Sequence, residues 1–338
     1  MSRIRNRLPQ WLIAGFLGTW IVTSGCTALA AEAWSLPNSG IRMETEEKQA
    51  YVAEKMEKLF HSSSAATVTA KPFSPPDGWA YEHYDLGSCN VERMENPKAK
   101  SHRIVLQFHG GGYINPLGDG HRSLCVKQMV LTEAKSGYLL DYRTAPEHTY
   151  PAALEDAIKA YEDILAKGAD PKEIVVFGDS AGGNLALELS LYLREHHRPQ
   201  PGAVVLISPW STFETNLPSR TRNAERDMIL GKINPRMYNE VRKPSYGKGF
   251  SAKDPRLSPI YADLKDFPPM LIQAGGQELF LDESIALAKK AAEDGTDVTL
   301  TVYPDMSHDF ALLLPELEDS VVSCREIRDF LNRHMKDD

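Results

Sequence analysis

The chain alternates short apolar runs with longer stretches in which apolar residues recur every three to four positions. The short runs are rich in Val, Ile and Leu and predict buried strands, whereas the longer stretches predict amphipathic helices. The predicted strands are 103–109, 137–142, 173–178, 203–208, 269–274 and 298–303. The predicted helices are 121–135, 151–167, 181–196, 281–293 and 317–335. Because the two kinds alternate, we expect an α/β fold with a mostly parallel central sheet and helices on both faces.

Residues 31–79 differ from this pattern, because they are polar and irregular apart from one amphipathic helix between Glu44 and Phe60. The apolar positions of that helix are Tyr51, Val52, Met56, Leu59 and Phe60. A link rich in Ser and Pro follows, and the alternating pattern begins near residue 80. We therefore treat 31–79 as a segment that precedes the main domain, which spans 80–338.

The first 30 residues have the pattern of an export signal. Arg3, Arg5 and Arg7 precede an apolar stretch, 11–22, and Ala28-Leu29-Ala30 offers a small-x-small cleavage site. We expect a signal peptide over 1–30, removed on export to the periplasm or the medium, so that the mature chain has no stable membrane span.

Two alternatives to cleavage stay open. Cys26 could carry a lipid, although the Thr23-Ser24-Gly25 before it makes a poor lipobox because Thr replaces the usual aliphatic residue. The uncharged stretch 11–31 could also remain as an uncleaved anchor.

Composition narrows the class of protein. The chain is 42% hydrophobic and 25% charged, as in soluble globular proteins, and its formal net charge of −8 argues against a nucleic-acid partner. Beyond residue 30 the cysteines are Cys89, Cys125 and Cys324, whose spacing fits no metal site. Three cysteines cannot all pair within one chain, so one disulfide or three free thiols remain open.

The stretch 174–186 combines an apolar run, the pattern Gly178-x-Ser180-x-Gly182 and a helical segment. A sharp strand-to-helix turn of this kind presents its serine as a nucleophile, and glycines flank it because Cβ atoms would crowd the turn. Gly-x-Ser-x-Gly alone also occurs in ordinary turns, but the flanking strand and helix favour the nucleophile elbow. We expect Ser180 at the carboxyl end of a strand.

A glycine-rich loop, His109 to Gly112, directly follows the strand 103–109. Its amides, with that of Ala181, could hold the oxygen of a tetrahedral intermediate. A phosphate-binding loop is disfavoured because no Lys-Ser/Thr follows. We expect His109 to brace the loop rather than to act as a base.

His308 lies on a loop beyond the last predicted strand, where it can serve Ser180 as a general base. The carboxylate that orients it would follow strand 269–274, where Glu278 and Asp282 are both present; we favour Glu278, which is nearer to the strand end. The order Ser180, Glu278, His308 is the one this strand–turn–helix context uses. This chemistry needs no metal and no organic cofactor.

Together these motifs resemble the bacterial hormone-sensitive-lipase-like esterases of the α/β-hydrolase fold, over roughly residues 80–335. The matching stretches are 109–112 (His-Gly-Gly-Gly), 141–147 (Asp-Tyr-Arg-Thr-Ala-Pro-Glu), 150–156, 178–183 (Gly-Asp-Ser-Ala-Gly-Gly) and 307–310 (Ser-His-Asp-Phe). Many members of this family carry Asp where Glu278 stands, which keeps Asp282 as the reserve.

The resemblance implies a helical cap built from residues 31–79 and an insertion at about 211–250. It implies a carboxylesterase that cleaves short to medium acyl esters through a Ser180–His308–Glu278 triad and an acyl-enzyme. The oxyanion donors would be the amides of Gly111, Gly112 and Ala181, and a homodimer would form through about 298–335. The alternatives are an amidase or peptidase, a transacylase and, less favoured, a non-catalytic binding protein.

The substrate is the least determined feature. Candidate residues for lining the acyl pocket are Tyr113, Trp210, Phe213, Met228 and Ile229, each of which could equally be plain core. Three arginines of the expected cap, Arg220, Arg222 and Arg226, could meet an acidic substrate, but a solvated charged face is the favoured interpretation.

Overall fold

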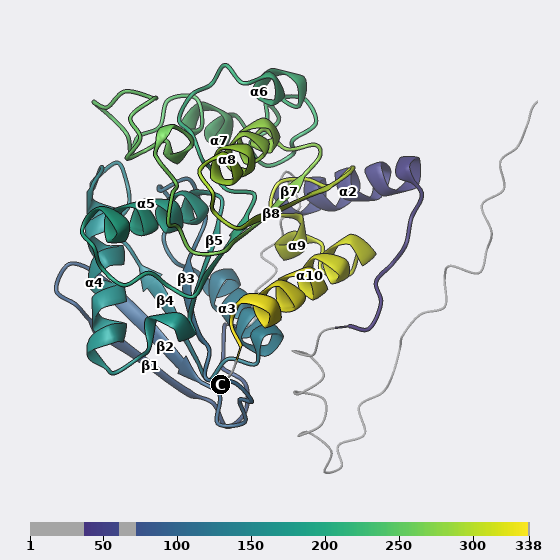
Figure 1. Ribbon diagram of the computed structural model, residues 1–338. Coiled ribbons are helices and arrows are strands. Elements are labelled where there is room, and N and C mark those ends of the chain that lie inside the picture. Colours follow the sequence, from purple (N-terminus) through teal and green to yellow (C-terminus); the bar gives the residue numbers. More distant parts are fainter. Residues whose placement is uncertain (1–36, 61–71, 337–338) are drawn as a thin grey trace, which may run out of the picture.

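An eight-stranded sheet organises the computed structural model, which describes residues 37–60 and 72–336 (Figure 1). Its strands are β1 (Ala80–Asp85), β2 (Asn90–Glu95), β3 (Ile104–Phe108), β4 (Ser136–Asp141), β5 (Ile174–Asp179), β6 (Ala203–Ile207), β7 (Met270–Gly275) and β8 (Val298–Tyr303). The longer helices are α2 (Thr45–Phe60), α3 (Asp119–Thr132), α4 (Ala152–Ala166), α5 (Ala181–Glu195), α8 (Leu281–Glu293) and α10 (Glu318–His334). The predictions of a signal peptide, of an uncleaved anchor and of a lipid on Cys26 concern residues outside this range, as does the part of the predicted Ser- and Pro-rich link that precedes residue 72.

The strand order is β1-β2-β4-β3-β5-β6-β7-β8. All neighbours from β4 to β8 are parallel, while β2 pairs antiparallel with both β1 and β4. The expected mostly parallel sheet is therefore confirmed. The hairpin of β1 and β2 was not predicted, because β1 at the sheet edge is largely solvent-exposed and lacks an apolar run.

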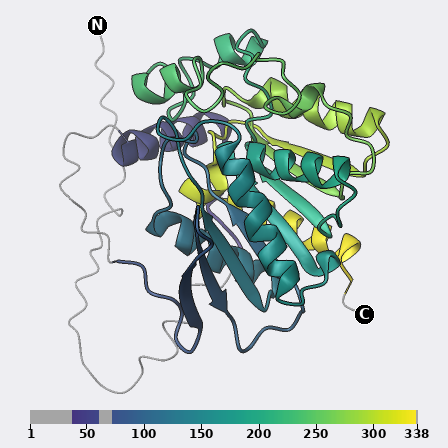
Figure 2. The same cartoon turned by 90° about the vertical axis from the view of Figure 1, so that its left-hand side faces the viewer.

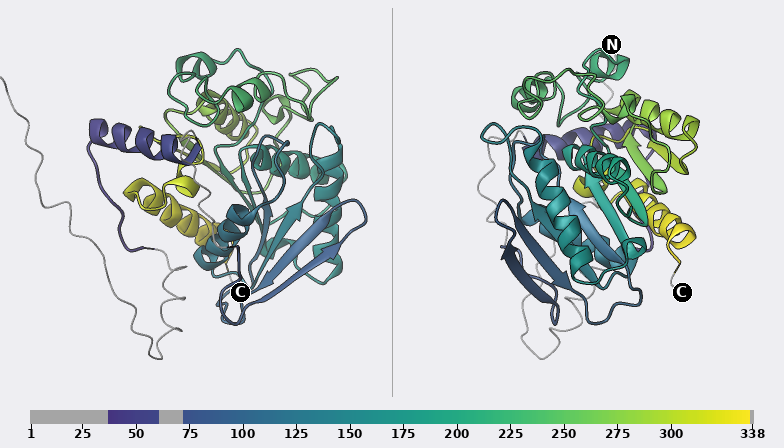
Figure 3. Two further views of the ribbon diagram at one scale, coloured as in Figure 1. Left: turned by 180° about the vertical axis from the view of Figure 1, so that it is seen from behind. Right: turned by 60° about the vertical axis from the view of Figure 1, so that its left-hand side comes forward.

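Helices cover both faces of the sheet, as the alternating pattern predicts (Figures 2 and 3). On one face α3 and α10 pack together over residues such as Val105 and Phe177, and on the other α4, α5 and α8 cover Leu106 and Val176. Successive strand residues thus enter two different cores, which is why β3, β5 and β6 are buried at every position and mostly apolar rather than alternating.

The predicted strands and helices all exist, with ends that differ by at most three residues. Short elements were missed, most of them rich in Pro, Asn or Arg and without an apolar period. They are α6 (Pro218–Arg222), α7 (Pro235–Glu240), α9 (Phe310–Leu313) and the 3₁₀ turns η2 (Pro171–Glu173) and η3 (Pro259–Tyr261). Two of them, α6 and α7, lie in the region expected to form the cap, above the carboxyl ends of the strands (Figure 1).

The predicted amphipathic helix forms α2, which packs beside α9 and the end of β8 (Figure 3). Its Val52 and Met56 are buried against Tyr303, Phe310 and Leu314. Within residues 37–60 and 72–336, no helix combines the length and apolar character needed to cross a bilayer.

The three cysteines in the described part of the chain are all free thiols. Cys89 and Cys125 are buried, and Cys324 on α10 is partly exposed. The sequence left open either one disulfide or three free thiols, and the structure contains three free thiols.

Candidate active site

Ser180 stands at the sharp turn between β5 and α5, where it has φ 52° and ψ −117°. A positive φ is strained for a residue with a side chain, and it marks a turn that its surroundings hold in place. A Cβ on Gly178 would lie 2.3 Å from the carbonyl oxygen of Gly182, and one on Gly182 would lie 2.0 Å from that of Phe108. The expected elbow is present, and both glycines are required by close backbone contact.

A chain of hydrogen bonds joins three buried side chains across the ends of β5, β7 and β8. Ser180 Oγ lies 3.0 Å from Nε2 of His308, and Nδ1 of His308 lies 2.9 Å from Oε2 of Glu278. Their exposed fractions are 4%, 1% and 0%. In this arrangement the imidazole can accept the serine proton while the carboxylate orients the ring.

The structure also separates the two candidate carboxylates. Glu278 reaches His308, whereas Asp282 faces α6: its Oδ2 accepts a hydrogen bond from the backbone N–H of Ser219 at 2.7 Å, and its Oδ1 lies 3.2 Å from the Arg222 guanidinium. Asp282 therefore braces α6 against α8, and the extra methylene of Glu278 spans the distance to the imidazole.

Residues of the expected cap hold the turn that carries Glu278. Asn223 Nδ2 donates to the carbonyl oxygens of Glu278 and Gly276, at 2.9 and 3.3 Å. Asp227 Oδ2 accepts from the backbone N–H of Leu279 at 2.8 Å. No sequence pattern pointed to Asn223 or Asp227, because each acts through a backbone contact about fifty residues away.

The glycine loop after β3 presents free amides near Ser180. Gly111 and Gly112 have φ of 112° and 66°, a conformation that favours glycine. Among the described residues, the backbone N–H groups of Gly111, Gly112 and Ala181 have no protein acceptor. Unpaired amides beside a nucleophile are the donors that an oxyanion hole requires.

His109 lies under this loop, as expected. Its Nδ1 donates to the carbonyl oxygen of Gly110 at 2.7 Å, and its ring stacks on Tyr142 at 4.2 Å between centroids. Burial, together with the nearby His121, lowers the pKa of His109 to about 3. The ring is thus neutral and acts as a fixed support.

Buried charges control the ionisation of the histidine. Burial alone would lower the pKa of His308, but the carboxylates of Asp309 and Glu278 outweigh it and raise that pKa to about 10. Burial in turn raises the pKa of Glu278, against the opposing effect of His308. The site therefore favours an imidazolium, the form that arises when the histidine takes a proton.

Two further carboxylates at the site escaped sequence reasoning. Asp309 Oδ2 lies 3.2 Å from Nε2 of His308, and Asp179 is buried beside Gly110. Burial raises the pKa of Asp179 to about 6 and that of Asp309 well above its usual value. Asp179 directly precedes Ser180, and Asp309 directly follows His308. The only sequence feature that could have pointed to either carboxylate is therefore its place beside a predicted catalytic residue.

A pocket of about 420 Å³ opens above Ser180 and His308. Its apolar lining comes from the expected cap and from α3 and α9: Leu124, Ile229, Leu230, Met237, Leu312 and Leu313. Of the five lining residues proposed from the sequence only Ile229 lines it; Tyr113, Trp210 and Phe213 are core residues and Met228 packs beside α2.

Of the three arginines in the expected cap, Arg222 and Arg226 are exposed, as the favoured interpretation predicts, but Arg220 is not. Arg220 is buried and its Nη2 lies 2.5 Å from Oε2 of Glu283, so it joins α6 to α8. Arg222 pairs with Asp282. Arg220 and Arg222 do not line the pocket above Ser180; the arginine that lines it is Arg236. Within the described residues, no cluster of three or more His, Cys, Asp and Glu side chains could hold a metal ion.

Comparison with known proteins agrees with this fold. A family model described as the α/β hydrolase fold matches residues 105–312. An acetyl-hydrolase of Streptomyces hygroscopicus is 35% identical over 225 residues, 66% of this chain and 73% of that one. The putative acetyl-hydrolase LipR of Mycobacterium tuberculosis is 32% identical over 76% of this chain and 82% of its own. The crystal structure of an esterase from the bacterial hormone-sensitive lipase family superposes with a TM-score of 0.75 at 30% identity, covering 87% of this chain and 100% of that one.

Proposed function

The chain belongs to the α/β-hydrolase family of hormone-sensitive-lipase-like esterases, and we propose that it is a carboxylesterase that cleaves short to medium acyl esters through Ser180, His308 and Glu278. The observation that carries the proposal is the continuous hydrogen-bond chain from Ser180 Oγ through His308 to Glu278.

In the proposed mechanism His308 takes the proton of Ser180 as the serine oxygen attacks the ester carbonyl. The negative charge that develops on the carbonyl oxygen is stabilised by the amides of Gly111, Gly112 and Ala181. His308 then protonates the leaving alcohol, and an acyl-enzyme remains on Ser180. A water molecule, deprotonated by His308, releases the acid in a second cycle.

Two observations support short to medium acyl chains. The pocket of about 420 Å³ is lined in part by apolar side chains of the expected cap, among them Ile229, Leu230 and Met237. Two relatives are named acetyl-hydrolases, which points to the short end of the range. We expect activity to fall once the acyl chain outgrows this pocket.

The test is hydrolysis of p-nitrophenyl esters from C2 to C16 by the chain and by its Ser180→Ala variant. We expect a maximum between C2 and C8 and a loss of about 10³-fold or more in kcat for the variant. Activity that survives Ser180→Ala would refute Ser180 as the nucleophile. A maximum of activity at C12 to C16 would refute the proposed preference for short to medium acyl chains, but not the role of Ser180.

A further inference from the structure

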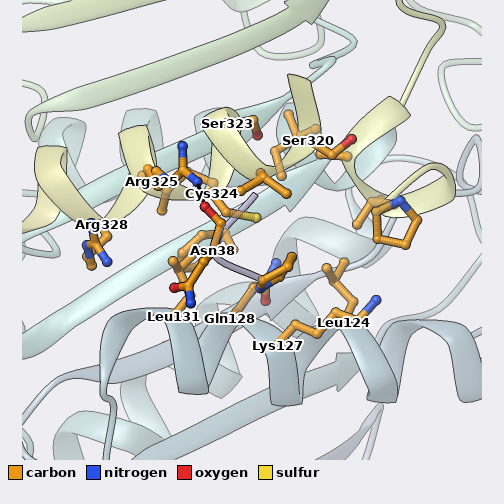
Figure 4. A pocket seen from close by; sticks show the side chains of 18 residues that line it. Asn38, Leu124, Lys127, Gln128, Leu131, Ser320, Ser323, Cys324, Arg325 and Arg328 are labelled. Atoms are coloured by element: carbon orange, nitrogen blue, oxygen red, sulfur yellow. Dashed lines mark hydrogen bonds between the residues drawn. The ribbon is translucent and has the colours of Figure 1, made fainter. Parts of the chain in front are cut away.

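A second cavity, of about 180 Å³, lies between α3 and α10 on the sheet face below the catalytic pocket. Figure 4 shows side chains of α10 on one side of it and side chains of α3 on the other, with Asn38 between them. Leu124, Lys127 and Leu312 line both spaces, so they form the wall that separates this cavity from the pocket above Ser180.

The inner part of the cavity is apolar. It extends to the sheet, where Phe177 of β5 and Ile207 near the end of β6 line it, and Ile327 of α10 and Leu131 of α3 close its sides. A cavity of about 150 Å³ with such a lining holds a benzene ring. We therefore estimate room for an apolar group of about six to eight carbons.

The rim of the cavity is positively charged. Lys127, Arg325 and Arg328 line it, and among the described residues no Asp or Glu does. Lys127 forms no ion pair within that part of the chain. Arg325 and Arg328 have only loose acidic partners, Glu318 at 3.5 Å and Asp329 at 3.4 Å, and Nη2 of Arg325 also donates to the carbonyl oxygen of Asn38. Ion pairs as loose and exposed as these contribute little to stability, so the guanidinium groups can bind an anion.

Gln128 supplies an independent sign of a polar ligand. It is only 5% exposed, it lines the cavity, and its buried Oε1 has no hydrogen-bond partner. A buried polar atom without a partner costs free energy unless a ligand or water satisfies it. Because the two ends of a Gln amide can exchange by rotation, Gln128 can present an N–H to an acceptor oxygen as well.

We propose that this cavity binds an anionic amphiphile, namely a carboxylate with an unbranched chain of about eight carbons. The chain would lie among Leu131, Phe177 and Ile327, and the carboxylate would lie at the rim near Arg325 and Gln128. This binding needs no reaction at Ser180, so it stands independently of the proposed hydrolysis. The occupant would touch Leu312 in α9, a helix that begins two residues after His308.

Calorimetric titration of octanoate into the full chain carrying Ser180→Ala tests the proposal without turnover. We expect saturable binding of one octanoate, at least about tenfold tighter than that of octan-1-ol and weakened by added salt. Absence of saturable binding, or equal affinity for the uncharged alcohol, would overturn it.

Cys324 provides a built-in reporter, because it lines the cavity and is partly exposed while Cys89 and Cys125 are buried. Alkylation by iodoacetamide, followed at the peptide containing Cys324 by mass spectrometry, should slow at least about fivefold when octanoate is saturating. Octanoate binding without protection of Cys324 would place the ligand elsewhere. A Cys324 that does not react in the ligand-free chain would mean that the cavity is closed, and would also contradict the proposal.

Arg325→Gln should weaken octanoate binding about tenfold, since it removes a charged donor at the rim. Arg333→Gln is the matched control, because Arg333 lies on the same helix, is exposed and does not line this cavity. Both variants should hydrolyse p-nitrophenyl acetate as the parent chain does, which shows that they fold. Equal octanoate affinity in the two variants would rule out the charged rim as the binding determinant.

Discussion

Asp309 Oδ2 lies 3.2 Å from Nε2 of His308, the same ring nitrogen that faces Ser180. Asp309 has φ 51°, a left-handed conformation that Asp tolerates better than most residues. Burial raises the pKa of Asp309 well above its usual value while its charge raises that of His308, so the two groups share the proton that His308 must release and regain during turnover. The carboxylate therefore sets the pH range in which His308 can act as a base.

We predict that Asp309→Asn shifts the rising limb of the pH profile of kcat/KM to lower pH. His308 is a base only when neutral, so activity rises as the pH passes its pKa, which Asp309 helps to raise to about 10. Removing that charge lowers the pKa, and the expected shift is about one pH unit or more.

Asp305→Asn is the control for this change, since Asp305 lies on the same loop but accepts a hydrogen bond from Gln49. Its profile should match that of the parent chain. An unchanged profile for Asp309→Asn would mean that Asp309 does not influence the proton on His308.

Glu278→Gln should lower kcat by about 10³- to 10⁴-fold with little change in KM, because an amide cannot stabilise the imidazolium. Asp282→Asn should retain nearly full activity, since Asp282 bonds to Ser219 and not to His308. The pair is compared on one p-nitrophenyl ester. A larger loss in Asp282→Asn would reverse the assignment of the two carboxylates.

The sequence predicts an element correctly where the apolar pattern of the chain matches the burial of that element in the fold. The strands β3, β5 and β6 are buried on both faces and hence mostly apolar, and the glycines around Ser180 are required by close backbone contacts, of Gly178 with Gly182 and of Gly182 with Phe108. The strand β1 was not predicted, because at the sheet edge most of its side chains face solvent and it has no apolar run.

In the candidate active site, too, some residues could be predicted from the sequence and others could not. Ser180, Glu278 and His308 follow strand ends, so their approach could be expected from the topology alone. The contact of Asp309 with His308 and the support of Glu278 by Asn223 and Asp227 depend on how loops turn and how the cap segment packs. The lining of the pocket by Leu230, Met237 and Leu313 depends on the same packing, which no periodicity encodes.

Arg220→Met should destabilise the chain by about 3–5 kcal/mol, because it leaves Glu283 buried without its cationic partner. Burial already raises the pKa of Glu283 to about 7 even with Arg220 beside it. Urea unfolding of Arg220→Met and of Arg220→Met with Glu283→Gln measures the effect. The double variant should recover part of the lost unfolding free energy. An Arg220→Met variant as stable as the parent chain would contradict a structural role for the pair.

Glu188→Gln should raise the stability of the chain at alkaline pH. Glu188 is 1% exposed, both of its carboxyl oxygens lack partners, and burial raises its pKa well above the usual value. The folded state thus holds the proton more tightly than the unfolded state, so stability is lost as the pH rises above about 4.5. Gln removes this loss, and Tm should rise by about 2 °C or more at pH 8.

The gain from Glu188→Gln should vanish near pH 4, where both states of the parent chain carry the proton. Glu195→Gln, an exposed change on the same helix, should leave Tm unchanged at either pH. A gain of equal size at both pH values would show that ionisation of Glu188 is not its cause.

Covalent labelling with a fluorophosphonate tests whether Ser180 is an activated nucleophile. The reagent forms a stable covalent bond only with a serine that a nearby base deprotonates. We expect one adduct per chain, located on Ser180 by peptide mass spectrometry; its formation should be slowed in His308→Ala and absent in Ser180→Ala. No adduct in a chain that unfolds cooperatively, or an adduct on another serine, would contradict it.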